Sequence, residues 1–279
     1  MLKSSSRSAA LTATNLLLPG RFSPTDVPII ENHQFSYAAL DPTSIKVLNW
    51  NIAKNNEHPQ WLADFNQLAI QGQLDLMFFQ EVRLCWSGQC PLAVQGVGWN
   101  FAPNFMDVQS RSYFGVLTAS NVRSLWSQSL LSQHAEPIVN TPKVALITAY
   151  PLRHSHQKLL TVNIHGINFV STSKFKAQLH QLEKYLATAH GAMILSGDFN
   201  TWNRDRMNLL TRMTTRLGLQ SVHFPDKHRL KRFWLSDPLD HIFYRGLQEK
   251  PGSAIVPPDY SSSDHCPMRV EFSVLPTPA

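Results

Sequence analysis

The sequence Ala192-Met193-Ile194-Leu195-Ser196-Gly197-Asp198-Phe199-Asn200 joins an apolar run to a polar end. The apolar part is short and predicts a buried strand. Asp198 and Asn200 follow it two residues apart, and side chains at positions i and i+2 point to the same side of an extended chain. A carboxylate and a carboxamide that project together can hold a water molecule or a hard cation beside a phosphate. Gly, Asp and Asn also form turns, so this stretch alone is equally consistent with a turn.

Five further stretches place polar residues at the edges of apolar runs. These residues are Asn49 and Asn51 in 45–52, Gln80 and Glu81 after 74–79, His165 after 159–164, Asp240 before 241–244, and Asp264 and His265 before 267–272. Side chains carried by strand ends are held by a rigid scaffold, which suits binding and catalysis. The repeated pattern therefore indicates one site built on a sheet.

Composition limits the class of protein and of partner. The 279 residues are 43% hydrophobic, which is typical of a globular protein of one or two domains. No apolar run approaches the roughly 20 residues that span a bilayer. The net charge of +6, from 25 basic and 19 acidic residues, favours anionic partners: nucleic acid, phosphoesters or acidic lipid surfaces. It does not choose among them.

The termini and the cysteines bear on organisation and compartment. Residues 1–43 predict an extended or poorly ordered arm, 44–274 a catalytic domain, and 275–279 a loose tail. The N-terminal apolar stretch is interrupted by polar residues, so we expect a cytoplasmic protein, with a weak export signal as the open alternative. Three cysteines favour free thiols, and a Cys85–Cys90 disulfide is the alternative in an oxidising compartment.

Hydrophobic periodicity predicts a mixture of helices and strands. Helical spacing covers 59–71, 174–189 and 203–217; strand patterns cover 45–52, 74–80, 115–119, 143–149, 159–164, 192–196, 241–244 and 268–273. The chain has no internal repeat, no strict βαβ alternation and no Gly-rich phosphate loop. These patterns predict one mixed α/β domain whose sheets are covered by helices.

The six motifs, taken in order, resemble the series found in the endonuclease/exonuclease/phosphatase superfamily. They are Trp50-Asn51-Ile52, Gln80-Glu81, Asn163-Ile164-His165, Gly197-Asp198-Phe199-Asn200, Leu239-Asp240-His241-Ile242 and Ser263-Asp264-His265. The resemblance covers roughly Ile45 to Phe272, and the stretches 162–169 and 243–247 are most similar to the YafD-like bacterial branch. It implies a deoxyribonuclease-like four-layer α/β sandwich, with two mixed, mainly antiparallel sheets flanked by helices.

The resemblance also implies roles for particular residues. The cofactor would be Mg²⁺, with Mn²⁺ as an alternative, and the metal-binding residues would be Asn51, Glu81 and Asp264. The catalytic residues would be His165, Asp198, Asn200, Asp240 and His265. Each residue has a structural alternative, such as a turn, an edge carboxylate or a buried hydrogen-bonding group.

Within that set, Asp198 would orient and deprotonate the attacking water, and Asn200 would hold the water or a phosphate oxygen. His265 would contact the phosphate, with Asp240 fixing its tautomer. His165 would donate to the charge that develops on the phosphoryl group. Asn49 and His241 have no role in the family and are interpreted as structural.

Two departures from the family pattern stand out. No acidic residue follows the Trp-Asn motif, where the chain has Ile52-Ala53-Lys54, which puts a second metal site in doubt. No carboxylate can be assigned to pair with His165.

The substrate is least specified. Nine basic residues between Arg204 and Arg232 are interleaved with Trp202, Phe224, Phe233 and Trp234, which suits a nucleic acid backbone and its bases. A solvated helix face with packing aromatics explains the same segment equally well. Our leading hypothesis is a Mg²⁺-dependent phosphodiesterase, a nuclease, acting as a monomer. The alternatives are a phosphatase or phospholipase-type hydrolase on a small or lipid phosphoester, and an inert binding module of the same fold.

Overall fold

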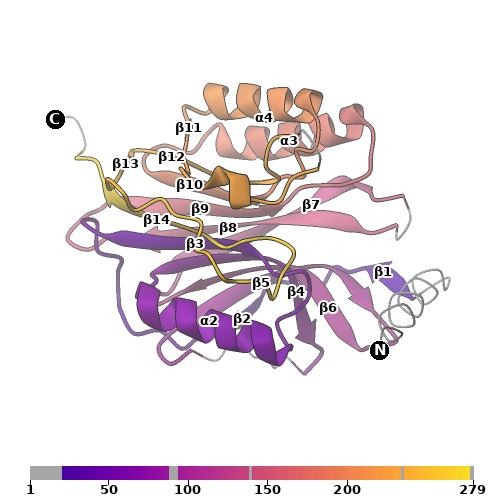
Figure 1. Ribbon diagram of the computed structural model, residues 1–279, viewed down its shortest axis with the longest axis horizontal. Coiled ribbons are helices and arrows are strands. Elements are labelled where there is room, and N and C mark those ends of the chain that lie inside the picture. Colours follow the sequence, from indigo (N-terminus) through magenta and orange to yellow (C-terminus); the bar gives the residue numbers. More distant parts are fainter. Residues whose placement is uncertain (1–20, 88–93, 138–139, 234–235, 277–279) are drawn as a thin grey trace.

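The computed structural model describes residues 21–87, 94–137, 140–233 and 236–276. Two β-sheets face each other at the centre of the molecule (Figure 1). Helix α2 (Pro59–Gly72) covers the outer face of one sheet, and helices α3 (Thr172–Leu186) and α4 (Arg204–Arg216) cover the outer face of the other. The predicted four-layer α/β sandwich is therefore confirmed.

Both sheets are mixed and mainly antiparallel, as expected. The first has the order β1 (Phe22–Pro24), β5 (Gly98–Asp107), β6 (Ser112–Ser120), β4 (Leu76–Cys85), β3 (Ile45–Asn51), β14 (Met268–Val274) and β13 (Leu247–Glu249), with β2 (Ile30–Asn32) also paired to β5. The second has the order β11 (Gln220–Ser221), β12 (Asp240–Arg245), β10 (Met193–Asp198), β9 (Lys158–His165), β8 (Pro142–Pro151) and β7 (Trp126–Ala135). A 3₁₀ helix, η1 (Lys227–Arg229), lies between β11 and β12. Each sheet contains one parallel pair, β3/β4 and β9/β10.

These two parallel pairs position the polar strand ends. Parallel neighbours bring their carboxyl ends to the same edge of a sheet. The antiparallel strands β12 and β14 begin at this edge, because Asp240 is opposite Asp198 and Met268 is opposite Asn49 in the strand register. All six motifs therefore converge on one edge of the sandwich.

A buried polar network joins the two sheets beneath that edge. The Gln80 side chain donates to Asn49 Oδ1 (3.0 Å) and to Asn163 Oδ1 (2.7 Å). Ser196 Oγ donates to Asn49 Oδ1 (2.9 Å), and Asn163 Nδ2 donates to the Leu117 carbonyl (2.9 Å). Buried polar groups are tolerated when they are hydrogen bonded, and a network that links strands of both sheets fixes their mutual position.

Several elements differ from the prediction. β5 and β7 were not predicted, because β5 is interrupted by Pro103 and β7 is an edge strand rich in Ser and Gln. The predicted helix 174–189 ends at Leu186. β1 and β2 lie within the predicted N-terminal arm and pair with β5, while the domain boundary at residue 44 stays a prediction.

Other expectations fall partly outside the described residues. Cys85 and Cys266 are free thiols, and Cys90 lies outside the described residues. Residues 1–20, which would carry any export signal, also lie outside them. Among the helices that are described, none has the length and apolarity needed to cross a bilayer.

Candidate active site

Glu81 is carried on a β-bulge at the end of β4. The register of β4 against β6 shifts between Phe79 and Val82, and Glu81 itself has a left-handed backbone (φ 55°). A bulge re-aims the side chain of its extra residue, and this one directs Glu81 towards the polar edge. The Glu81 carbonyl accepts from Lys54 N (2.9 Å), which ties the bulge to the chain following β3.

The Glu81 carboxylate is surrounded by positive charge. Lys54 Nζ lies 3.2 Å from Oε2, and His165 Nε2 lies 3.9 Å from Oε1. Burial raises the pKa of Glu81, but Lys54, His165 and Lys143 outweigh it and hold the pKa well below its usual range. Glu81 is therefore ionised at any physiological pH.

The position of Asp198 depends on the preceding Gly197, where the close approach of β10 to β9 leaves no room for a side chain. Gly197 has φ 151°, and a Cβ there would lie 1.9 Å from the Ile164 carbonyl oxygen of β9. This close approach keeps Asp198 directly opposite His165 on β9 and Asp240 on β12. The strand register therefore sets the spacing of these three side chains.

Two amides hold the Asp198 carboxylate. Asn51 Nδ2 donates to Oδ2 (2.9 Å), and the backbone N–H of Asn200 donates to Oδ1 (2.9 Å). Asn200 has a left-handed backbone (φ 53°), which asparagine tolerates, and its Nδ2 donates to the Gly166 carbonyl (2.9 Å). Asn200 therefore shapes both the turn after β10 and the loop after β9.

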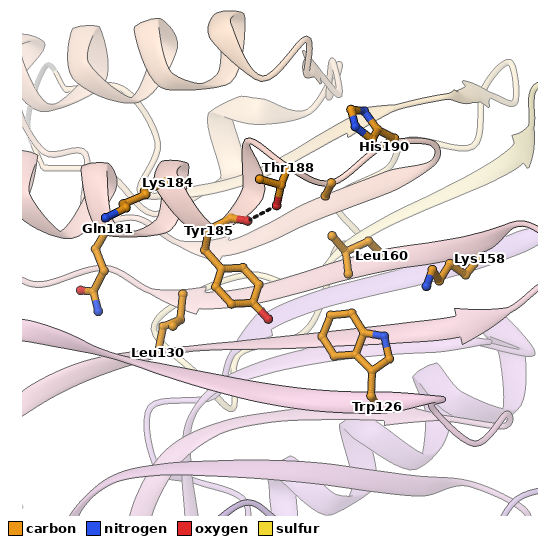
Figure 2. Close-up of a pocket in the computed structure, with 10 residues that line it drawn as sticks. Trp126, Leu130, Lys158, Leu160, Gln181, Lys184, Tyr185, Thr188 and His190 are labelled. Atoms are coloured by element: carbon orange, nitrogen blue, oxygen red, sulfur yellow. Dashed lines mark hydrogen bonds between the residues drawn. The ribbon is translucent and has the colours of Figure 1, made fainter.

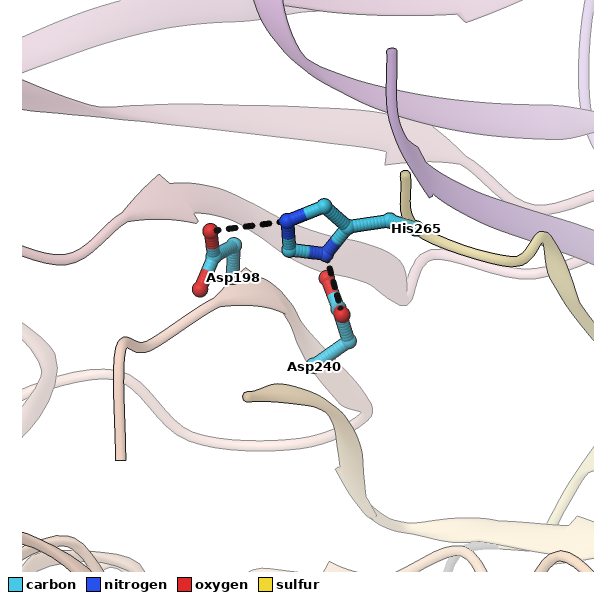
Figure 3. Close-up of side chains that lie close together, drawn as sticks. All are labelled: Asp198, Asp240 and His265. Atoms are coloured by element: carbon cyan, nitrogen blue, oxygen red, sulfur yellow. Dashed lines mark hydrogen bonds and ion pairs between the residues drawn. The ribbon is translucent and has the colours of Figure 1, made fainter. Parts of the chain in front are cut away.

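Asp198, Asp240 and His265 form a buried cluster (Figure 3). His265 Nδ1 lies 2.6 Å from Asp240 Oδ2, and His265 Nε2 lies 3.9 Å from Asp198 Oδ2. One ligand atom from each residue lies within 4.8 Å of the others, which is close enough to hold a metal ion. His265 and Asp240 are also hydrogen bonded to each other, so the geometry also suits proton transfer.

Burial and neighbouring charges shift the pKa values of Asp198 and His265, which face each other in this cluster. Burial and the charge of Asp240 raise the pKa of Asp198 to about 7. Burial alone would lower the pKa of His265, but Asp240 and Asp198 outweigh it and raise that pKa to about 9. His265 is therefore a cation at neutral pH, with Nδ1–H donated to Asp240 and Nε2–H free.

His165 lies between the carboxylates of Asp198 and Glu81, neither of which the sequence paired with it. Its Nε2 is 3.7 Å from Asp198 Oδ2 and 3.9 Å from Glu81 Oε1. Burial and the nearby Lys143 ammonium lower its pKa well below the usual value, which favours the neutral ring. His165 therefore links the Glu81 side of the site to the Asp198 side.

Asp264 is set apart from the other predicted metal-binding residues. Its side chain is 61% exposed, it forms an ion pair with Lys231, and its Oδ1 lies 4.0 Å from His265 Nε2. Among the described residues, no hydrogen bond or ion pair joins it to Glu81 or Asn51. Asp264 therefore borders the His265 side of the site.

Glu81 and Asn51 carry oxygen atoms that suit a hard divalent cation. Glu81 is ionised and partly exposed, and the Lys54 ammonium 3.2 Å away shows that its carboxylate attracts a cation. Asn51 Oδ1 accepts from Ala53 N (3.0 Å) and has a second lone pair to offer. Carboxylate and amide oxygens are ligands that Mg²⁺ accepts while keeping several waters.

Sequence reasoning missed the cationic residues of the site. Lys54 contacts Glu81 at the position where the missing acid was noted, so the departure itself was the available signal. Lys143, at the start of β8, affects the pKa values of both Glu81 and His165. Nothing in the sequence pattern marked it, because Lys143 belongs to none of the six motifs.

The basic segment between Asp198 and Asp240 is divided in the structure. Arg206 is buried, Arg216 pairs with Glu183, and Lys231 pairs with Asp264. Phe224 is buried and Trp234 lies outside the described residues. Besides Arg216, the exposed members are Arg204, Arg212, Lys227, His228, Arg229, Arg232 and Phe233.

The predicted structural residues behave differently from the site residues. Asn49 belongs to the buried network between the sheets. His241 Nε2 is hydrogen bonded to Thr201 Oγ1 (2.8 Å), and burial lowers the pKa of His241 to about 4. Neither lies among the contacts of Asp198 or Glu81.

A separate cavity of about 890 Å³ lies between α3 and the strands β7 and β9. Tyr185 from α3 points towards Trp126 of β7, and Leu130 and Leu160 lie on the strands nearby (Figure 2). Leu160 is near the start of β9, whereas His165 is at its end. The cavity is therefore distinct from the candidate active site.

Comparisons with known proteins agree with the fold and the motif order. The model of the Endonuclease/Exonuclease/phosphatase family matches residues 48–265. A UPF0294 protein of Erwinia tasmaniensis is 34% identical over 236 residues, covering 82% of this chain and 81% of that protein. The resemblance to the YafD-like branch is confirmed by this relative.

Solved structures share the fold at low identity. The catalytic domain of human Nocturnin, solved with a bound sulfate anion, superposes with a TM-score of 0.62 at 18% identity, covering 85% of this chain and 96% of that one. An endonuclease/exonuclease/phosphatase family protein from Leptotrichia buccalis gives a TM-score of 0.63 at 15% identity, covering 82% and 99%. With its family match extending across both sheets and all six motifs, the chain belongs to the endonuclease/exonuclease/phosphatase family.

Proposed function

We propose that the protein is a Mg²⁺-dependent phosphodiesterase that cleaves nucleic acid. The observation that carries the proposal is the buried Asp240–His265 pair facing Asp198 across 3.9 Å, with Glu81 and His165 beside it. Hydrolysis of a phosphodiester needs an activated water, neutralised phosphoryl oxygens and a stabilised leaving oxygen. The residues present can supply each of these.

Asp198 is the proposed base. Its pKa of about 7 places it where a carboxylate can accept a proton from water near neutral pH, because a general base works best when its pKa is near the working pH. The amides of Asn51 and Asn200 hold the carboxylate in one orientation. The side chain therefore needs no rearrangement to accept the proton.

His265 is the proposed phosphate ligand and proton donor. Asp240 accepts from Nδ1, so the free Nε2–H points towards the space beside Asp198. The imidazolium can donate there to a phosphoryl oxygen and stabilise the negative charge that develops. Neutral His165 contributes a second ring nitrogen on the Glu81 side.

Glu81 and Asn51 are the proposed magnesium ligands, with Asp264 as the third predicted member. Bound Mg²⁺ would supply Lewis-acid stabilisation of phosphoryl charge. Lys54 Nζ lies 3.2 Å from Glu81 Oε2, and its side chain is 52% exposed, so the ammonium can move aside when a cation binds. In this proposal the metal-binding residues lie beside the proton-transfer groups Asp198 and His265.

Nucleic acid is the proposed substrate because the chain is basic and carries a basic segment between two of the site motifs. The net charge is +6, and exposed basic residues of η1 and its flanks lie between the Asp198 and Asp240 motifs. Lys and Arg side chains that neutralise backbone phosphates supply most of the non-specific affinity for nucleic acid.

A phosphoester panel with metal titration tests the proposal. The panel contains a single-stranded oligonucleotide, plasmid DNA, RNA, a phosphomonoester and a sphingomyelin-type lipid, each with Mg²⁺, Mn²⁺ or EDTA. We expect metal-dependent cleavage of a nucleic acid by wild type, its loss in Asp198→Asn, and its retention in the exposed control Asp237→Asn. Hydrolysis confined to the phosphomonoester or the lipid would overturn the proposal that the substrate is nucleic acid. Absence of metal binding by calorimetry, with no hydrolysis, would select the inert binding module.

A further inference from the structure

We propose that the loop of residues 166–170 forms a stacking subsite, in which the ring of Phe169 binds a nucleobase next to the scissile phosphodiester. This inference rests on the proposed function and names a part of the substrate that the catalytic groups do not contact. It is carried by the exposure of the ring, by the backbone that presents it and by the buried contacts beneath the loop.

Phe169 is exposed and close to the catalytic groups. Its side chain is 65% exposed, more than any other large hydrophobic residue described. It follows His165 by four residues and Gly166 by three, and the Gly166 carbonyl accepts from Asn200 Nδ2 (2.9 Å). Three residues span at most about 11 Å, so the ring lies within one or two nucleotides of a phosphate held at Asn200.

The backbone holds Phe169 in a conformation that phenylalanine rarely adopts. Its φ of 51° lies in the left-handed region, which is costly for a bulky side chain. The Asn168 side chain fixes this turn, because its Oδ1 accepts from Phe169 N (2.8 Å) and from Trp202 Nε1 (2.9 Å). Such strain persists where the surroundings determine it, and it gathers at ligand-binding sites.

The hairpin between β7 and β8 supports the loop from one side. Glu136 Oε1 accepts from the backbone N–H of Asn168 (2.8 Å), and Glu136 Oε2 lies 3.4 Å from Lys143 Nζ. Both side chains are only 12% exposed. The loop is therefore also held by a hydrogen bond to Glu136, which is itself part of a largely buried ion pair.

Arg206 supports the loop from the side of α4. It is fully buried, donates to the Ile167 carbonyl, and stacks on Phe175 at 3.9 Å and on Trp202 at 5.2 Å from the ring centroids. Its Nε and Nη1 have no hydrogen-bond partner among the described residues. Burying a guanidinium with two unpartnered nitrogens lowers the stability of the fold, and the contact of Arg206 with the loop is kept despite this cost.

The chemistry of the loop fits a planar ring better than a lipid surface. The residues next to Phe169 are polar Asn168 and half-buried Val170, whose side chain packs on the core beneath α3. One exposed ring is too small an apolar area to anchor a protein in a bilayer, but it offers a face for one base. Lys174 and Lys176 are exposed at the start of α3 and can contact flanking phosphates.

Replacement of Phe169 by glycine tests the subsite without disturbing the fold. Glycine adopts φ 51° freely, so Phe169→Gly should fold at least as well as wild type while lacking the ring. We expect its KM for a single-stranded oligonucleotide to rise about tenfold with kcat nearly unchanged, as for the loss of one stacked base. Phe169→Trp should retain the wild-type KM. The control Tyr37→Ala removes a ring that is 57% exposed and lies before β3, away from the site.

A modified substrate separates the outcomes. An oligonucleotide with abasic residues flanking the cleaved bond should raise the wild-type KM to that of Phe169→Gly, and should not raise the KM of the variant further. If wild type cleaves the oligonucleotide and Phe169→Gly keeps its KM, the subsite is refuted while the proposed function stands. If wild type cleaves no nucleic acid, both fail. If the variant loses binding only to phosphatidylglycerol vesicles, the ring contacts lipid and the nucleobase proposal is overturned.

Discussion

The substitution Asp240→Asn should shift the pH dependence of catalysis rather than abolish activity at every pH. Asp240 Oδ2 lies 2.6 Å from His265 Nδ1, and its charge is the main cause of the raised His265 pKa. Asparagine keeps a hydrogen-bonding oxygen at this position but removes the charge. Without that charge, burial favours the neutral ring, so the His265 pKa should fall from about 9 to its usual 6.5 or below.

The size of the effect follows from this change. A fall from about 9 to 6.5 corresponds to about 3 kcal/mol of lost stabilisation of the imidazolium. At pH 8 about 90% of His265 is protonated in wild type and about 3% would be in the variant. If the imidazolium is the active form, kcat/KM at pH 8 should fall by about 30-fold.

The pH profile of kcat/KM for oligonucleotide cleavage measures this change. Wild type should rise through about pH 7 as Asp198 ionises and fall through about pH 9 as His265 loses its proton. In Asp240→Asn the falling limb should move to pH 6.5 or lower and the rising limb should move below pH 7, because the charge of Asp240 raises the pKa of both His265 and Asp198, while Asp237→Asn keeps the wild-type profile. A variant whose falling limb stays near pH 9 would refute the assigned role of the pair.

Three further perturbations test the framework of the site. Gly197→Ala should lower the free energy of unfolding by about 3 kcal/mol in urea denaturation, because the added Cβ would lie 1.9 Å from the Ile164 carbonyl oxygen. The control Gly191→Ala, where nothing lies within 4 Å of the added Cβ, should cost about 1 kcal/mol. Equal losses in the two variants would contradict this reasoning. Lys54→Met should tighten Mg²⁺ binding in calorimetry by about fivefold, since it removes the cation beside Glu81, and weaker binding would show that Lys54 assists the metal. The pKa of Asp198 is raised from 3.8 to about 7, so its contribution to stability is full below pH 3.8 and is lost as the pH rises through about 7. The free energy of unfolding should therefore decline between pH 3.8 and 7 in wild type and stay flatter in Asp198→Asn. Parallel curves for the two proteins would contradict the raised pKa.

The strands and helices around the site were predictable because they carry strong periodic patterns. The run before Ser196 and the run before Gln80 are apolar and short, and both are central strands of the sheets. β7 escaped prediction because an edge strand exposes polar residues on both faces, which weakens the alternation that marks a strand. In β5 the strand pattern is interrupted by Pro103, which cannot donate a backbone hydrogen bond.

The site was predictable as a set of strand ends but not as a set of contacts. The pairing of Asp198 with His165 and Asp240 follows from strand register, which no local pattern gives. The bulge at Glu81 and the left-handed turn at Asn200 are tertiary features that re-aim side chains after the strands are placed. Lys54 and Lys143 were missed because their roles depend on distance in space to Glu81 and His165.

The most direct measurement is single-turnover cleavage of a labelled single-stranded oligonucleotide by wild type, Asp198→Asn and Glu81→Gln, with and without Mg²⁺. We predict cleavage by wild type only when Mg²⁺ is present. Asp198→Asn should bind Mg²⁺ normally and cleave at least a hundredfold more slowly, about the loss expected for a general base. Glu81→Gln should require much more Mg²⁺ for the same rate. Cleavage that persists in EDTA, or that survives Asp198→Asn at the wild-type rate, would contradict the proposed mechanism.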